Sequence, residues 1–422
     1  MPEVCVNAIC ELLKNHPRSE NRWIGIEVER LMVGANNKVL HYRDSMEPLL
    51  NALKNEKKWA VDYESDGHLL GIKRNLHAIS LEPGAQFEVS AAPRKTIQEV
   101  KKVADEIDAE IFSLPMTKGW KFLEIGVNPF EDEKQIELLP SPRYKLMDSY
   151  FQKIPPANSG PLPRRGREMM RLTTGLQVNL DFSSESEAVS MLRAAFWVTP
   201  ILATLFSNSP YRHKRVTGNL SERHQIWRAT DPLRSGFPAF IFQKDLSLKT
   251  YAEYISKIPL MYYFDADGHA VDPKGKAFVD LPNELKKKTA LSCMRQLFAE
   301  VRLKPCCVEV RCFDQQTDAE RYAAVALTVG LLYDDENRSL IQQKFKDVKA
   351  ETLSKWMDEG SKKGLKVEPL YELSLEFLRL AEKGLERRGF NEVEFLKPVE
   401  EIIKSTFTPA EKLLKKWGEE LG

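Results

Sequence analysis

The chain has 422 residues, of which 42% are hydrophobic and 29% charged, and its 62 Lys and Arg nearly balance 61 Asp and Glu. This is the composition of an ordinary globular protein with enough apolar residues for a large core. The balanced charge disfavours a general binder of nucleic acids or anionic membranes, because such proteins need a basic excess on one face. A small-molecule function without a nucleic-acid partner is therefore expected.

The start of the chain and its cysteines set expectations about location. Glu3 and Glu11 lie where a secretory signal would need a cationic start and an apolar run. The longest apolar stretches, residues 192–206 and 322–333, are shorter than a bilayer requires. The 6 cysteines have no CxxC pair and no regular spacing, which disfavours a disulfide framework or a zinc site. We therefore expect a cytoplasmic protein with no membrane partner.

Strand and helix patterns alternate along the first half of the chain. Residues 3–14 are predicted to form a helix, and a strand is predicted near residues 23–33. Residues 95–113 have the pattern of a further helix. Proline and glycine crowd residues 152–167, which predicts an exposed loop. Residues 186–206 then indicate a buried helix.

Strand signals nearly vanish in the last hundred residues. Residues 370–388 form an amphipathic pattern that ends at Gly389, a typical residue after the end of a helix. We expect residues 322–422 to form a mainly helical layer. This layer would belong to a single domain that spans residues 1–422.

Four segments carry polar side chains at alternate positions, namely residues 24–29, 79–90, 175–182 and 307–313. Because strand side chains alternate between two faces, each segment would place carboxylates or amides on one face and aliphatic groups on the other. For any single strand, a half-solvated antiparallel sheet with its polar face in water gives the same pattern. Together, however, the segments supply several acids with few local cations: Glu27, Glu29, Glu82, Glu88 and Glu309.

The shared polar face indicates a metal site. Like charges repel one another unless something positive lies among them. Hard divalent cations with carboxylate and amide oxygen ligands meet this need, and magnesium typically arrives with a phosphate-bearing substrate. The sheet is therefore expected to form the floor of a metal–nucleotide site. The sequence contains no P-loop, no HExxH and no GxSxG motif that would favour a competing chemistry.

Ordered matches along these strands and beyond them resemble one enzyme family. LEPGAQFEVSAAP at residues 81–93 is similar to the segment LEPGGQFELSGAP of glutamate–cysteine ligases of the plant and alphaproteobacterial type. LQVNLDFSSE at residues 176–185 is similar to VQVNLDFSSE of the same family. Further similar segments are LFSNSPY at 205–211, LSERHQIWRATDPLRSG at 220–236, EVRLK at 300–304, VGLLYD at 329–334, GLERRGF at 384–390 and TPAE at 408–411.

The resemblance implies a fold and an activity. The fold would be of the α+β class, with a curved antiparallel sheet forming a funnel as in glutamine synthetase and helices packed around it. ATP would phosphorylate the γ-carboxylate of glutamate, and the amino group of cysteine would then displace phosphate, which is the first step of glutathione biosynthesis. Magnesium would be the cofactor, and the enzyme would be a monomer or a homodimer.

The resemblance also implies roles for particular residues. Arg311 and Glu309 would be catalytic, with the Arg311 guanidinium reaching the transferring phosphoryl group. Arg223 and Trp227 lie in the segment that resembles the substrate-binding LSMRSHIW, so Arg223 would bind the α-carboxylate of glutamate and Trp227 would form the pocket wall. Arg143, in PRYKLM, is a further candidate for binding a substrate anion, with a structural salt bridge as the alternative. The implied metal ligands are Glu27, Glu29, Glu82, Glu88, Gln177 and Glu309.

Three departures from the family pattern are expected to change residues of the pocket wall while keeping the metal ligands, and they leave the acceptor open. GTEHE is GIEVE here, so Val28 replaces a histidine, and MMFRTCT is MMRLTTG, which introduces Leu172 and Thr174. LEMRGAD is VEVRCFD. A related γ-glutamyl ligase with a different amine acceptor is therefore an alternative. A non-catalytic relative that binds an amino acid or a nucleotide is another, which the costly cluster of acids disfavours.

Overall fold

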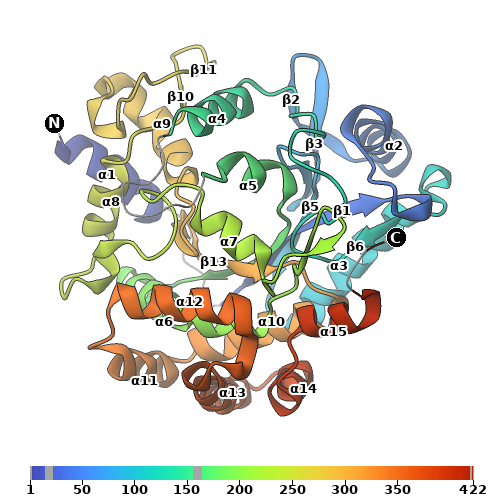
Figure 1. Cartoon of the computed structure of the whole chain (residues 1–422). Helices are drawn as coiled ribbons and strands as arrows, with labels where there is room; N and C mark the ends of the chain where they lie inside the picture. The colour runs from blue at the N-terminus through green and yellow to red at the C-terminus, as the bar shows by residue number, and fades with distance from the viewer. Residues whose placement is uncertain (1, 15–21, 155–163, 419–420, 422) are drawn as a thin grey trace.

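The computed structural model describes residues 2–14, 22–154, 164–418 and 421, and Figure 1 shows its ribbon. One 9-stranded sheet organises the described residues. Its strands are β1 (Ile24–Val33), β2 (Ala60–Ser65), β3 (His68–Arg74), β4 (His77–Leu81), β5 (Phe87–Arg94), β6 (Lys121–Leu123), β7 (Gly175–Asp181), β12 (Val301–Lys304) and β13 (Cys307–Asp314).

The strands pair in the order β12-β13-β7-β1-β5-β4-β3-β2, and β6 pairs with the end of β1. Every pairing in this order is antiparallel. Two small hairpins lie outside the sheet: β8 (Tyr211–Arg212) with β9 (Arg215–Val216), and β10 (Tyr263–Phe264) with β11 (Ala270–Val271). The predicted α+β fold, an antiparallel sheet with surrounding helices, is confirmed.

The helices of the first half are α1 (Pro2–Lys14), α2 (Glu47–Lys57), α3 (Ile97–Phe112), α4 (Pro142–Lys153), α5 (Gly166–Leu172), α6 (Glu185–Leu205) and α7 (Glu222–Arg228). Those of the second half are α8 (Leu248–Ser256), α9 (Asn283–Arg295), α10 (Asp318–Leu332), α11 (Asp335–Phe345), α12 (Ala350–Lys363), α13 (Glu368–Arg388), α14 (Lys397–Ser405) and α15 (Pro409–Trp417). In Figure 1, α6 and α11–α14 gather at the lower side of the molecule, whereas α4 and α5 lie above them.

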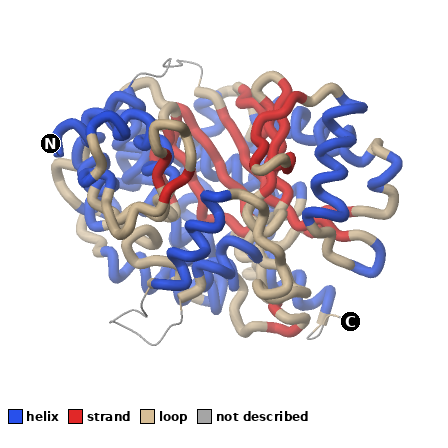
Figure 2. Tube along the Cα trace, turned by 90° about the horizontal axis from the view of Figure 1, so that it is seen from above, coloured by secondary structure: helices blue, strands red, loops and turns tan. Residues whose placement is uncertain are grey.

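The apolar face of the sheet builds the largest part of the core. Ile26 and Val28 of β1, Val178 of β7 and Val310 of β13 are buried in one cluster with the apolar residues of α6 and α10. Figure 2 shows the strands running through the middle of the molecule with helices on either side. Because side chains alternate along a strand, this burial places the acids of the same strands on the opposite face.

Helix α6 is the central helix of this core. Its start is fixed by Ser184, whose hydroxyl accepts a hydrogen bond from the backbone N–H of Glu187. By length and composition, α6 is apolar enough to cross a membrane, but 78% of its apolar window is buried inside the fold. It therefore packs as a core helix, as its sequence pattern predicts.

Several predicted helices are confirmed at nearly their expected bounds. Residues 3–14, 95–113, 186–206 and 370–388 correspond to α1, α3, α6 and α13, and α13 ends at Gly389 in the left-handed conformation, with φ 78°. The described residues after β13 form helices and turns without a strand. Of the loop predicted at 152–167, residues 155–163 lie outside the described residues. A single domain stays a prediction.

Helices α10 and α13 approach so closely that glycine is required at their contact. A Cβ at Gly330 would lie 2.5 Å from the Ala381 carbonyl oxygen, and one at Gly384 would lie 2.1 Å from the Gly330 carbonyl oxygen. We expect Gly330→Ala to lower the free energy of unfolding by about 1 to 3 kcal/mol, because the helices must separate. Urea denaturation would measure the change.

Lys383→Ala, at an exposed position of the same helix α13, is the matched control, with an expected change within about 0.5 kcal/mol. Equal stability of Gly330→Ala and the wild type would contradict the close helix contact.

Candidate active site

Strand register brings five of the six predicted metal ligands together, all except Glu309. Glu27 of β1 lies opposite Gln177 of β7, and Glu29 lies opposite Glu88 of β5. Glu82 follows β4 directly in the chain. All of these side chains line one cavity of about 560 Å³ on the polar face of the sheet. The period-two pattern of the strands therefore placed these acids correctly on a common face.

Helices and loops opposite the sheet complete the wall of this cavity. α4, α5, α7 and the last residue of α9 contribute to it, together with Tyr262 next to β10, Phe298 after α9 and Tyr63 of the edge strand β2. The wall is largely aromatic and apolar and contains two arginines: Tyr63, Arg143, Tyr144, Met147, Met169, Met170, Trp227, Tyr262, Arg295 and Phe298. A charged floor thus faces a wall suited to the apolar parts of small substrates.

Three carboxylates in the cavity form a cluster that can hold a metal ion. Oxygen atoms of Glu29, Glu82 and Glu88 lie within 4.8 Å of one another. Gln177 donates a hydrogen bond of 2.5 Å from Nε2 to Glu29, while its own Oε1 is buried without a hydrogen-bond partner. Carboxylate and amide oxygens suit a hard divalent cation, and the buried, unpartnered Oε1 fits a further ligand. The residues present therefore fit the implied magnesium ion.

These carboxylates are destabilised as anions in the protein alone. Burial, followed by the charge of Glu82, raises the pKa of Glu29 to about 7. Burial also raises the pKa of Glu82, and burial together with Glu82 raises that of Glu88 well above its usual range. Glu88 accepts hydrogen bonds from Ser80, at 2.9 Å, and Ser90, at 3.5 Å, but makes no ion pair among the described residues.

Glu309 has the opposite environment. It is fully buried and forms ion pairs with Arg302, Lys304 and Arg311, at 2.9 Å for Arg311 Nη1. Although burial alone would raise the pKa of Glu309, these three cations hold it well below its usual range. Glu309 therefore belongs to a cluster with three cations and not to the group of unpaired carboxylates. Its role as a metal ligand stays a prediction.

Glu27 joins the two parts of the polar floor. Asn179 donates a hydrogen bond of 3.0 Å to its Oε1, and Lys304 forms an ion pair with the same oxygen. Its charge also contributes to the raised pKa values of Glu82 and Glu88. Glu27 therefore lies between the unpaired acids and the cations around Glu309.

The predicted substrate-binding residues are not all in the cavity wall. Trp227 lines the cavity, and the guanidinium groups of Arg223 and Arg311 lie 5.0 and 5.4 Å from its ring centre. Arg223 itself is only 2% exposed and is absent from the lining. Its Nη2 donates a hydrogen bond of 3.1 Å to the Arg311 carbonyl oxygen. Arg223 therefore supports the wall from behind.

Arg143 has the environment expected for binding a substrate anion. It lines the cavity, its guanidinium lies 5.0 and 4.7 Å from the rings of Tyr63 and Tyr144, and it donates a hydrogen bond to the Tyr144 hydroxyl. The alternative, a structural salt bridge, is not seen among the described residues. Although burial lowers the pKa of Arg143, the phenol groups of Tyr144, Tyr262 and Tyr63, followed by Glu82, hold it above the usual range.

The sequence departures lie away from the cavity, so their interpretation as pocket-wall changes is wrong. Val28 is in the core on the apolar face, because it alternates with Glu27 and Glu29. Leu172 is fully buried, and the Thr174 hydroxyl donates a hydrogen bond to the Ile125 carbonyl oxygen. None of the three side chains lines the cavity.

Two further cations of the cavity lining, Arg302 and Lys304, were not predicted as site residues from the sequence. Their signal was present in EVRLK, where two cations alternate with Val301 and Leu303. A Pro-Cys turn links this run to the strand that contains Glu309. Reading the two runs as a hairpin would have placed Arg302 opposite Glu309, which is the register observed.

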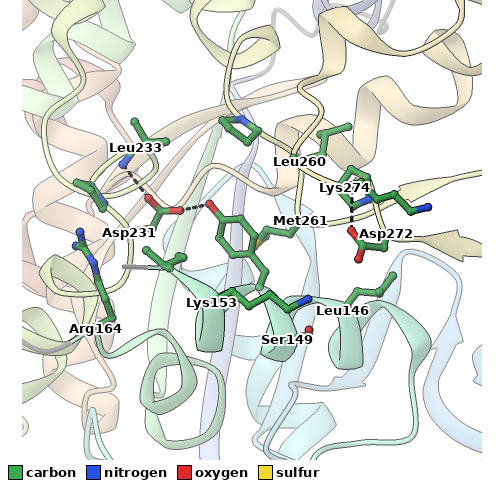
Figure 3. Close-up of a pocket in the computed structure, with 16 residues that line it drawn as sticks. Leu146, Ser149, Lys153, Arg164, Asp231, Leu233, Leu260, Met261, Asp272 and Lys274 are labelled. Atoms are coloured by element: carbon green, nitrogen blue, oxygen red, sulfur yellow. Dashed lines mark hydrogen bonds between the residues drawn. The ribbon is translucent and has the colours of Figure 1, made fainter. Parts of the chain in front are cut away.

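A second cavity, of about 680 Å³, lies on the other side of α4 (Figure 3). Arg143, Tyr144 and Met147 of α4 point into the first cavity, whereas Leu146 and Tyr150 line the second. The Tyr150 hydroxyl donates a hydrogen bond to Asp231, which also forms an ion pair with Arg234. As Figure 3 shows, Asp231 further accepts a hydrogen bond from the backbone N–H of Leu233. Because Asp231 is satisfied in this way, the described residues that line the second cavity offer no comparable cluster of unpaired acids.

Solved structures define the fold class. The glutamate–cysteine ligase of Francisella tularensis, in complex with AMP, superposes with a TM-score of 0.54 and 14% identity, covering 95% of this chain and 85% of that one. A bifunctional glutathione synthetase from Pasteurella multocida gives a TM-score of 0.56 and 14% identity, covering 98% of this chain and 51% of that one. The fold is thus one found among ligases.

Sequence comparison identifies the family. The pattern of glutamate–cysteine ligase family 2 matches residues 23–422. The chain is 33% identical over 420 residues to the chloroplastic glutamate–cysteine ligase of Solanum lycopersicum, covering 95% of this chain and 78% of that protein. It is also 33% identical over 412 residues to that of Arabidopsis thaliana, covering 94% and 77%. The chain belongs to glutamate–cysteine ligase family 2.

The predicted cytoplasmic location is wrong on this comparison. The similar enzymes from tomato, Arabidopsis and rice are named as chloroplastic proteins. The prediction rested on unpaired cysteines, which indicate reducing conditions. Reducing conditions do not distinguish one compartment from another, so the cysteines could not identify the location.

We expect Mg²⁺ to stabilise the protein more at about pH 8 than at about pH 5.5. The pKa of Glu29 is raised from 4.5 to about 7, so the folded state binds more protons than the unfolded state between these values. Its contribution to stability is full below about pH 4.5 and is lost as the pH rises through about 7. A bound metal ion replaces these protons, and its effect on Tm should therefore grow with pH.

Thermal unfolding with and without Mg²⁺ at both pH values measures this effect. Glu88→Gln should greatly reduce the metal-induced rise in Tm, whereas Glu64→Gln, at an exposed position of β2, should leave it unchanged. An equal rise at both pH values would contradict the assignment of the unpaired acids to a metal.

Proposed function

We propose that this chain is an ATP-dependent glutamate–cysteine ligase that joins the γ-carboxyl of glutamate to the amino group of cysteine through γ-glutamyl phosphate. One observation carries the proposal: a single cavity contains an unpaired carboxylate cluster next to a group of cations, with Glu27 between them. Transfer of a phosphoryl group to a carboxylate needs both, because several negative charges must come together.

The unpaired acids would hold the metal ions. Glu29, Glu82 and Glu88 supply carboxylate oxygens, and Gln177 supplies its unpartnered amide oxygen. Bound Mg²⁺ would screen the phosphate charges and align the displacement. The preference for Mg²⁺ over other divalent ions is part of the proposal, and it rests on the oxygen-only ligand set.

Arg311 would stabilise the transferring phosphoryl group. Its guanidinium lines the cavity and is fixed at one end by Glu309, through a hydrogen bond of 2.9 Å. Because Glu309 is fully buried, water does not compete for its carboxylate, and the carboxylate can hold the Arg311 guanidinium in one orientation. In this proposal Glu309 acts through Arg311, and developing negative charge meets a donor that is already in place.

Arg143 would bind the α-carboxylate of glutamate. It is an arginine of the wall without a carboxylate partner among the described residues, and a planar guanidinium matches a carboxylate with two parallel hydrogen bonds. Trp227 would form the adjacent wall. We propose that Arg223, which lies behind Trp227 and holds the Arg311 backbone, positions these two residues rather than contacting substrate.

Cysteine is the proposed acceptor because the substitutions that left the acceptor open do not change the cavity lining. The residues that depart from the family pattern, Val28, Leu172 and Thr174, lie outside the cavity lining. The unpaired acids also disfavour a non-catalytic relative, because burying them together is costly without a metal ion. The proposed partners are small molecules, and a monomeric or homodimeric state stays a prediction.

The phosphoryl-transfer step can be tested with glutamate carrying ¹⁸O in its γ-carboxyl group. Formation of γ-glutamyl phosphate leaves one labelled oxygen on phosphorus when cysteine displaces the phosphate. We expect ADP and ¹⁸O-labelled inorganic phosphate in equal amounts with γ-glutamylcysteine, measured by mass spectrometry. Formation of AMP and pyrophosphate would contradict the proposal.

The substrate-binding assignment predicts that Arg143→Lys raises KM for glutamate about tenfold to a hundredfold, because lysine cannot form the paired hydrogen bonds. The KM for ATP should change little. Arg74→Lys is the matched control, since Arg74 also stacks on an aromatic ring, Trp59, but does not line the cavity.

Steady-state kinetics with each substrate varied would measure these changes. Wild-type KM for glutamate in Arg143→Lys, with a large increase in Arg223→Lys, would return the carboxylate-binding role to Arg223.

A further inference from the structure

Lys304 connects the metal-binding half of the floor to the cationic half. It is the last residue of β12, and its ammonium group forms ion pairs with Glu27 and with Glu309, the latter at 3.0 Å. It also lies 3.4 Å from the Asn179 side-chain oxygen. Three oxygens from three strands therefore surround one positive charge. The same oxygens are of the kind that coordinate a divalent metal ion.

The cations around Glu309 differ in how firmly they are held. Arg302 is tied to Glu309 and donates further hydrogen bonds to the carbonyl oxygens of Arg295 and Leu297, at 3.1 and 3.3 Å. Lys304 has only side-chain partners in the described residues and is the more exposed, at 27% of its side chain against 10% for Arg302. Its long flexible stem can move the ammonium group without disturbing β12.

Charge balance gives that movement a direction. In the free protein, Lys304 compensates Glu27, which otherwise faces the unpaired acids Glu29, Glu82 and Glu88. A divalent ion bound at these acids repels the ammonium group and competes with it for Glu27. A nucleotide that arrives with the metal brings phosphate oxygens, which are new acceptors for a point charge.

We propose that Lys304 is a phosphate-binding residue, held between Glu27 and Glu309 in the free enzyme and released to the terminal phosphate of the nucleotide when a divalent metal takes Glu27. The inference rests on the proposed function, because it assigns the nucleotide to this cavity. Lys304 thus competes with the metal alone but cooperates with the metal–nucleotide complex.

These opposite effects can be measured without turnover. Lys304→Met should bind Mn²⁺ alone about tenfold more tightly than the wild type, because a competing positive charge is removed. The same variant should bind a non-hydrolysable imido analogue of ATP with Mg²⁺ about tenfold more weakly, because a phosphate contact is lost. Electron paramagnetic resonance of free Mn²⁺ and equilibrium dialysis of the analogue give the two affinities.

Two controls separate charge from other effects. Lys304→Arg keeps the positive charge and should retain the wild-type affinity for Mn²⁺. Lys249→Met removes an exposed lysine of α8, with 74% of its side chain accessible, and should change neither affinity. If Lys304 has only a structural role, Lys304→Met should lower the affinities for both ligands or leave both unchanged. Either result would overturn the proposal.

A measurement on the wild type guards against misfolding of the variant. Acetylation of the Lys304 amine, followed by mass spectrometry, should increase when Mn²⁺ is added and decrease again with Mn²⁺ and the ATP analogue together. Unchanged labelling would also overturn the proposal. The ¹⁸O experiment tests the proposed function separately. If it finds γ-glutamylcysteine and labelled phosphate but the two affinities do not change in opposite directions, the proposed function is supported and the role of Lys304 is contradicted.

Discussion

The structure depends on how negative charge is compensated on the buried polar face of one sheet. A carboxylate removed from water must be protonated, paired with a cation or bound to a metal. Glu309 is paired with three cations, whereas Glu29, Glu82 and Glu88 have no such partner among the described residues. The floor of the cavity therefore has two parts. In one part the protein's own cations compensate the negative charge, and in the other part a bound ligand is needed to compensate it.

Sheet topology creates this division. β13 and β12 form a hairpin at one edge, and the pairing of Arg302 with Glu309 follows directly from its register. β1 and β5 lie nearer the middle, where Glu29 and Glu88 are directly opposite each other. Like charges opposite each other destabilise an antiparallel pair. A protein that keeps this arrangement needs a counter-ion at that position, which is the physical basis for assigning metal and phosphate to adjacent parts of the cavity.

The sequence predicted what local periodicity determines. Alternation in Ile24–Val33 placed Glu27 and Glu29 on one face, and Gly389 correctly predicted the end of α13. Contacts between distant segments could not be obtained in this way. The burial of Arg223 depends on how α7 packs behind the cavity wall, and the partners of Glu309 depend on the β12–β13 hairpin. Val28 was wrongly predicted to line the pocket, because the comparison with the family motif ignored the alternation of side chains along the strand. That alternation puts Val28 on the apolar face.

The most direct test of this account is the position of a bound metal ion. Crystals soaked in Mn²⁺ without nucleotide, measured near the manganese absorption edge, would locate the ion by its anomalous signal. The account predicts a peak among the carboxylates of Glu29, Glu82 and Glu88, within coordination distance of the Gln177 side-chain oxygen. A peak at Glu309, with its three cations displaced and the other acids unoccupied, would contradict it.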